Sequence, residues 1–281
     1  MSANGTWTCP TCRRPVGTPF CPQCGEAPLA PRDLTMRGLL GNLLHALTSV
    51  DGKMVRTFWC LLRYPGSLTM SYLAGARKPY IAPIQLFLVA NVFFFAVQSL
   101  TGANVFSSTL DSHMYQQDWS ELARSMVAER LRVSHRSLES YGPVFNRAVV
   151  LNAKSLVVLM TIPFALLLSL VFAAKRKALM THIVFSLHLY TFMLLLFSLA
   201  IVASALYARV GGPGLQDAMV DNVLTLIILA ACGVYVYAAE ARVFDVNGAG
   251  RVVSAVALTL AAGGIVIGYR FVLFLITLYS T

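Results

Sequence analysis

Apolar residues dominate the chain after about residue 80, in runs long enough to cross a lipid bilayer. The polar and charged residues of this part lie mainly between these runs, in short segments and in one longer stretch at about 101–150. A helix of about 20 apolar residues matches the thickness of the hydrocarbon core. The pattern predicts five transmembrane helices, at about 81–100, 151–174, 183–207, 223–239, and from 252 to a point between 271 and 279.

Two shorter amphipathic segments precede the first predicted span. Apolar residues recur at helical spacing on one face over 39–50, and over 53–63 they lie opposite basic residues. Both segments are too short to cross a bilayer, and a basic amphipathic helix is typical of the membrane interface. The basic side chains expected to face anionic lipid headgroups are Arg56, Arg63, Arg77 and Lys78.

Composition and charge agree with a membrane protein of defined orientation. The chain is 57% hydrophobic and 12% charged, with a mean hydropathy of +0.68, which excludes an ordinary soluble domain. Residues 1–80 carry nine Lys or Arg against three acids, whereas the segment between the first two spans carries five of each. The positive-inside rule therefore predicts a cytoplasmic N-terminus and, after five spans, an extracytoplasmic C-terminus. The first residues do not resemble a cleavable signal peptide. The net charge of +10 follows from this bias and requires no nucleic acid.

Four cysteines near the N-terminus form two Cys-x-x-Cys pairs, Cys9 with Cys12 and Cys21 with Cys24. Two such turns separated by eight residues can supply four thiolates to one tetrahedral ion, which is the pattern of a structural zinc ribbon. A segment this short has no core of its own, so we expect metal binding to supply its folding energy. A closed four-sulfur shell leaves no open coordination position for catalysis.

Other uses of the four thiols remain open at this stage: two disulfides, a redox dithiol, or iron in a rubredoxin-like shell. The predicted cytoplasmic location favours zinc over disulfides, because the cytoplasm keeps thiols reduced. Cys60 and Cys232 stand alone and are typical of small buried apolar residues.

The stretch from the ribbon to the first span resembles a family of bacterial multi-pass membrane proteins of unknown function. The resemblance rests on the ribbon followed by Asp51 to Thr57, Leu62-x-x-Pro65-Gly66 and Tyr72-Leu73-x-Gly75-x-Arg77-Lys78-x-Tyr80-x-x-Pro83 ahead of an aromatic-rich span. It covers residues 9 to about 100. It implies a zinc ribbon, a multi-pass architecture and the bacterial inner membrane, and it assigns no catalytic residue.

Polar residues inside the predicted spans could line a pathway or join helices. Arg270 is either an outer-interface residue, if the last span ends near 271, or a buried cation that needs a partner, if the span ends near 279. Asn91 and Gln98 are seven residues apart and share one helix face, where they could bond a neighbouring helix or line a polar seam. Gly264 and Gly268 form a small-xxx-small motif expected at a close helix contact, within the chain or in a homo-oligomer.

These patterns together predict an all-α integral membrane protein: a zinc ribbon over 1–28, a linker with interfacial helices over 29–80, and a membrane domain over 81–281 with an extracytoplasmic helical loop at about 101–150. We find no catalytic constellation, so an enzyme is not expected. The function favoured is a membrane-anchored interaction or regulatory protein that presents the zinc ribbon to a protein partner. A component of a small transporter or channel, with a polar pathway near Arg270, is the alternative, and an enzyme acting on lipids comes third.

Overall fold

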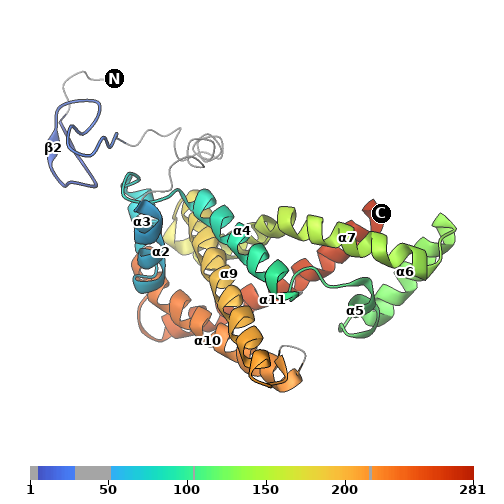
Figure 1. Cartoon of the computed structure of the whole chain (residues 1–281). Helices are drawn as coiled ribbons and strands as arrows, with labels where there is room; N and C mark the ends of the chain where they lie inside the picture. The colour runs from blue at the N-terminus through green and yellow to red at the C-terminus, as the bar shows by residue number, and fades with distance from the viewer. Residues whose placement is uncertain (1–5, 29–51, 104, 215–216) are drawn as a thin grey trace.

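The computed structural model of the chain describes residues 6–28, 52–103, 105–214 and 217–281 (Figure 1). The part of the chain so described is mostly helical, with a small four-cysteine module (residues 6–28) near the N-terminus. The amphipathic helix predicted over 39–50 lies outside the described residues.

The four-cysteine module contains two short antiparallel strands, β1 (Trp7–Thr8) and β2 (Pro15–Val16), in which Trp7 pairs with Val16. Helices follow throughout: α2 (Lys53–Arg63), α3 (Ser67–Leu73), α4 (Pro83–Thr101), α5 (Leu110–Tyr115), α6 (Ser120–Ser134), α7 (Leu138–Leu156), η2 (Val157–Met160), α8 (Thr161–Val171), η3 (Ala173–Lys175), α9 (Leu179–Arg209), α10 (Ala218–Val243) and α11 (Gly248–Ser280).

Five helical segments of the described chain are long and apolar enough to cross a membrane, as predicted. They are α4, the continuous stretch from Leu138 to Val171, α9, α10 and α11. Each carries large apolar side chains that remain exposed, such as Leu100 on α4, Leu170 on α8 and Leu260 on α11. Apolar surface left exposed around a helical bundle fits a multi-pass membrane protein.

The second segment begins earlier than the apolar run alone predicted. Its apolar part was expected from 151, but the helix starts at Leu138, where the Ser137 hydroxyl accepts a hydrogen bond from the backbone N–H of Ser140. The helix therefore begins inside the loop expected at 101–150, with a capped, amphipathic extension before its apolar part. The stretch is interrupted by the 3-10 turn η2 before it continues as α8.

The interior is built from aromatic and aliphatic side chains between α4, α8, α9, α10 and α11. α4 packs along α9, and α10 packs along α11. Phe106, in the loop after α4, makes edge-to-face contacts with Phe94, Phe197 and Tyr269, so one aromatic cluster joins α4, α9 and α11. This packing fixes which ends of the helices lie together.

One end of the bundle gathers the turns that join α8 to α9 and α10 to α11. Lys177 forms a salt bridge with Asp245 at 3.2 Å, and Lys175 donates a hydrogen bond to the backbone carbonyl of Asp245 at 2.9 Å. Arg242 donates to the carbonyl of Pro65, which ties the turn between α2 and α3 to the same end. This basic end is also where the four-cysteine module lies (Figure 1).

The opposite end carries α5, α6 and the end of the chain. The Tyr141 hydroxyl lies 2.6 Å from Thr281 Oγ1, so the start of α7 and the end of α11 are adjacent. The five helical segments thus alternate in direction, and the module and Thr281 lie at opposite ends, an arrangement that fits the predicted topology.

Candidate metal centre

The four cysteines come from two turns with the same backbone geometry. In the first turn, the N–H of Arg13 donates to the carbonyl of Cys9 at 2.7 Å. In the second, the N–H of Gly25 donates to the carbonyl of Cys21 at 2.8 Å. Arg13 and Gly25 both have left-handed backbone conformations, with φ of 58° and 70°. The motif Cys-Pro-x-Cys thus occurs twice, twelve residues apart, and its two copies fold into matching turns that face each other.

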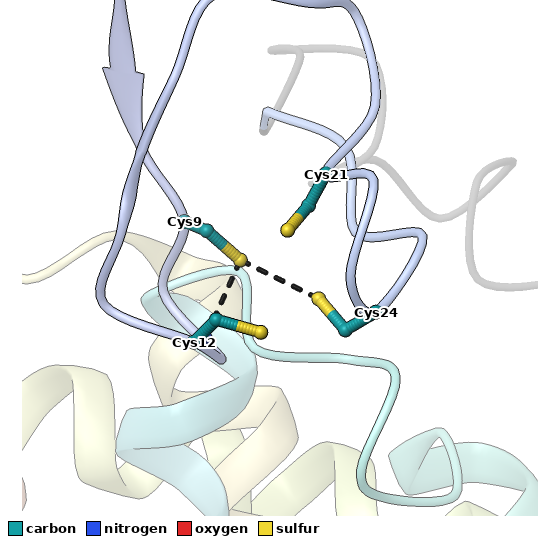
Figure 2. Close-up of side chains that lie close together, drawn as sticks. All are labelled: Cys9, Cys12, Cys21 and Cys24. Atoms are coloured by element: carbon teal, nitrogen blue, oxygen red, sulfur yellow. Dashed lines mark hydrogen bonds between the residues drawn. The ribbon is translucent and has the colours of Figure 1, made fainter.

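The two turns bring all four thiols together, as Figure 2 shows. The four sulfur atoms lie within 4.8 Å of one another. Cys9 Sγ lies 3.5 Å from Cys24 Sγ and accepts a hydrogen bond from the backbone N–H of Cys12 at 3.4 Å. All four are free thiols, and Cys9 and Cys21 are buried.

This geometry fits a tetrahedral metal ion. Four sulfurs at about 2.3 Å from a zinc ion are separated from one another by about 3.8 Å, close to the spacing found here. The donor set is sulfur alone, which suits zinc or iron and disfavours magnesium or calcium. The four cysteines therefore form a site that could bind a metal ion, and Cys9, Cys12, Cys21 and Cys24 are the residues that would hold it.

The thiols differ in how readily they ionise. The backbone N–H groups of Cys24 and Gln23 lower the pKa of the Cys21 thiol to about 7. Burial raises the pKa of the Cys24 thiol to about 12. Cys21 thus supplies a thiolate more readily than Cys24 near neutral pH, and a bound cation would favour ionisation of both.

Glu26, directly after the second turn, joins the four-cysteine module to the helical body. Its side chain is buried, and Oε2 accepts hydrogen bonds from the backbone N–H groups of Arg77 and Lys78 at 3.1 and 3.0 Å. The same oxygen accepts a hydrogen bond from the Thr11 hydroxyl at 2.8 Å. The sequence alone did not single out Glu26, because its backbone partners in the body lie more than fifty residues away. Thr11 was not singled out either, because its role follows from that of Glu26.

The basic residues expected to face lipid occupy different positions. Arg56 and Arg63 lie on the exposed side of α2. Arg77 lies over the ring of Tyr72 at 5.3 Å, and Lys78 is exposed beside Gly25. Arg77 and Lys78 thus lie at the contact between the module and the body, whereas Arg56 and Arg63 do not.

The polar residues of the spans make contacts within the bundle. Asn91 donates to the carbonyl of Lys154 in α7 at 3.0 Å, and Gln98 donates to Ser107 Oγ in the loop after α4 at 2.8 Å. Arg270 lies 22 residues into α11, about 33 Å from its start. Its guanidinium donates to Ser108 Oγ at 2.9 Å, so it is level with the far end of α4.

Gly264 and Gly268 face open space in the described residues. A Cβ atom built on either residue would meet no atom within 4 Å. The close helix contact expected there is not made within the described part of the chain. A contact between copies of the chain stays a prediction.

Comparison with known proteins gives one partial match. A family described as "Protein of unknown function (DUF3667)" matches residues 51–95, which run from the start of α2 into α4. The matched stretch contains the motifs from residue 51 to Pro83 on which the resemblance noted from the sequence rests. The four-cysteine module lies outside it. No curated protein and no solved structure matches the chain.

Proposed function

We propose that this protein is a membrane-anchored interaction or regulatory protein whose four-cysteine module binds a structural zinc ion and presents a surface to a protein partner in the cytoplasm. The observation that carries the proposal is the docking of a four-thiol site onto the helical body through Glu26. A module held in this way has a fixed orientation, with one side occupied and the other available.

The exposed surface of the module carries residues suited to recognition. Arg13, Arg14 and Phe20 are exposed, and Phe20 keeps 64% of its surface in solvent. Exposed Arg and aromatic side chains contribute disproportionately to protein interfaces. A hollow of about 390 Å³ lies between β2 and the second cysteine turn, with Arg14 and Val16 on one side and Pro22 on the other.

The basic end of the bundle supports a cytoplasmic location. The turn over 175–177 consists of Lys, Arg and Lys, and Arg63, Arg242 and Lys78 lie at the same end. Cytoplasmic loops of membrane proteins are enriched in such residues. The opposite loop, over 208–222, carries Arg209 as its one base and two acids, Asp217 and Asp221.

Site-specific photo-crosslinking in cells tests the proposal. A photoreactive phenylalanine analogue replaces Phe20 in one variant and Val133, an exposed residue of α6 at the far end, in a matched control. We expect a discrete protein adduct from position 20 that is absent from position 133. The adduct should also disappear in a Cys21→Ser, Cys24→Ser background at equal membrane levels.

Two results would argue against a recognition role. Labelling of lipid alone from position 20 would mean that this side of the module faces the membrane. An adduct that persists at full yield in the cysteine variant would mean that the folded metal site is not needed for the contact.

A further inference from the structure

A cavity of about 440 Å³ lies between the four-cysteine module and the helical body. The module supplies one wall, from Phe20 and residues 25–28. The opposite wall comes from α2, α3, the segment before α4, the first turn of α4, and His188 of α9. Segments distant in the sequence therefore enclose one space beside the metal centre.

The cavity is lined by more positive than negative charge. Lys53, Arg77 and Lys78 contribute three cations, and Glu26 contributes one carboxylate. The Oε2 atom of that carboxylate already accepts three hydrogen bonds, from Thr11 and from the backbone of Arg77 and Lys78. That oxygen is thus engaged in the docking contact, and three cations against one carboxylate give the lining a net positive charge.

One cation of this lining is held over an aromatic ring. The guanidinium of Arg77 stacks over the Tyr72 ring at 5.3 Å, and Tyr72 is buried. An arginine fixed by an aromatic ring presents a rigid fork of donors, the geometry that suits the oxygens of a phosphate. His188, another lining residue, forms a 2.8 Å hydrogen bond with Thr69 Oγ1.

Part of the lining is apolar. Leu68, Ile81 and Pro83 line the side next to the start of α4, the first of the five long apolar helices. If α4 crosses the bilayer, this side lies at the level where lipid headgroups meet acyl chains. A site lined by both cations and apolar groups suits a phosphate that carries an apolar group, and it also admits a soluble phosphate compound.

We propose that this cavity binds a phosphate group, presented either by an anionic lipid headgroup or by a soluble phosphorylated ligand. The segment that matches the family of unknown function covers residues 51–95 and contributes Lys53, Tyr72, Arg77, Lys78 and Gln85 to the lining. The stretch on which the family resemblance rests is therefore the stretch that builds most of the cavity. Phe20 lines the cavity and is also exposed, whereas Arg13 and Arg14 lie outside the lining. The cavity variants described below leave all three of these residues unchanged, so ligand binding can fail while partner recognition by the module stands.

The experiment compares two double variants of the full-length, metal-loaded protein. Arg77→Gln with Lys78→Gln removes two charges from the cavity and keeps the backbone N–H groups that bind Glu26. Arg56→Gln with Arg63→Gln removes two charges from the exposed side of α2, outside the lining. Both are placed in phosphatidylcholine nanodiscs with and without one tenth phosphatidic acid, and retained lipid is measured by native mass spectrometry.

A second arm uses inorganic phosphate, with binding followed by calorimetry on the same samples in pure phosphatidylcholine. We expect the wild-type protein and the Arg56, Arg63 variant to bind one phosphate-bearing probe, and the Arg77, Lys78 variant to bind it at least tenfold more weakly. If the Arg77, Lys78 variant binds phosphatidic acid more weakly than the wild-type protein and neither binds inorganic phosphate, the site is assigned to a lipid headgroup. A difference that also appears with inorganic phosphate assigns it to a soluble ligand.

Equal losses in both double variants would overturn the proposal, because they would reflect general charge attraction. Binding that is unchanged in the cavity variant, or absent from the wild-type protein with both probes, would overturn it as well. If the Arg77, Lys78 variant does not fold, Lys53→Gln tests the same lining, since Lys53 is exposed at the rim and its substitution leaves the docking contact intact. It should weaken probe binding by several-fold, and unchanged binding would count against the site.

Discussion

Glu26 is the residue on which the position of the four-cysteine module depends. One carboxylate oxygen accepts two backbone N–H groups of the body and the hydroxyl of Thr11 in the module. Hydrogen bonds to a charged acceptor contribute about 1.5–3 kcal/mol each. We therefore predict that Glu26→Ala accelerates hydrogen exchange at the amides of Arg77 and Lys78 by roughly tenfold or more, because both lose their acceptor.

The matched control for this prediction is Thr11→Val. It removes one donor to the same oxygen and leaves both backbone bonds in place, so exchange at Arg77 and Lys78 should stay near the wild-type rate. Equal exchange rates in the Glu26→Ala and wild-type proteins would show that the carboxylate does not hold the two parts together.

We expect the buried His113 to make the stability of the far end of the molecule depend on pH. Burial, with a further contribution from nearby Arg270, lowers the pKa of this histidine to about 4. The centre of its ring lies 4.8 Å from that of Phe274, and its Nδ1 accepts a hydrogen bond from the indole N–H of Trp119 at 3.3 Å. The folded state therefore holds the neutral imidazole, while the unfolded chain takes up a proton near the ordinary value of about 6.5.

Because the unfolded chain binds this proton more tightly than the folded protein does, His113 increasingly opposes folding as the pH falls from about 6.5 to about 4. Above about pH 6.5 it has no such effect. We predict that protection of residues 110–134 against hydrogen exchange, corrected for intrinsic rates, falls by roughly tenfold between pH 7.5 and pH 5. His113→Phe should flatten this dependence, whereas His135→Asn, at an exposed histidine, should preserve it. A dependence that survives His113→Phe would assign it to another group.

The metal-site residues and the docking residues differ in how far the sequence reveals them. Cys9, Cys12, Cys21 and Cys24 could be identified as a set because the spacing of ligands is a local property of the chain. Glu26 could not, because a single acidic residue gains its role from backbone groups at 77 and 78.

At the scale of elements, α2 combines a buried face with an exposed apolar face. Thr57, Cys60 and Leu61 are buried against the body, whereas Val55 and Trp59 are exposed, Trp59 by 63%. The exposed pair lies on one side of the helix at a spacing of four residues, as expected of a helix at a membrane interface. We predict that Trp59 contacts lipid and that nitroxide-labelled lipids quench its fluorescence in a Trp7→Phe background, with Trp59→Phe as the blank.

Substitutions on the buried face of α2 should lower the stability of the protein. Leu61→Ala removes a side chain with 1% exposure and should destabilise the protein by about 2–5 kcal/mol, whereas Trp59→Ala should leave the unfolding midpoint in detergent nearly unchanged. Unquenched Trp59, together with a large loss of stability in Trp59→Ala, would mean that this face is packed against protein.

Sequence patterns predicted the elements well where hydropathy or amphipathicity alone decides them. The helix expected over 53–63 has those bounds, and all five expected spans correspond to long apolar helices. The start of α7 at Leu138 was not predicted, because capping by Ser137 and the amphipathic stretch after it extend the helix beyond its apolar part. The open face at Gly264 and Gly268 also depends on which helices neighbour α11, and spacing does not specify this.

At the scale of the whole molecule, the metal site, the docking contact and the cavity form one connected unit at the basic end of the bundle. Residues 25–28 follow the second cysteine turn and supply both Glu26 and part of the cavity wall. A module of this size has no core of its own, so we expect a bound metal ion to supply its folding energy. The proposed recognition surface and the cavity wall therefore both require that the four cysteines bind one structural ion.

X-ray absorption spectroscopy of the purified full-length protein, combined with metal quantification, tests that claim most directly. We predict one zinc ion per chain, surrounded by four sulfur atoms at about 2.3 Å and by no nitrogen or oxygen ligand. A Cys21→Ser, Cys24→Ser variant should lose the zinc. Protein that contains no metal, or a zinc ion with oxygen or nitrogen in its shell, would contradict a closed four-cysteine site and remove the basis for the module as a rigid structural unit.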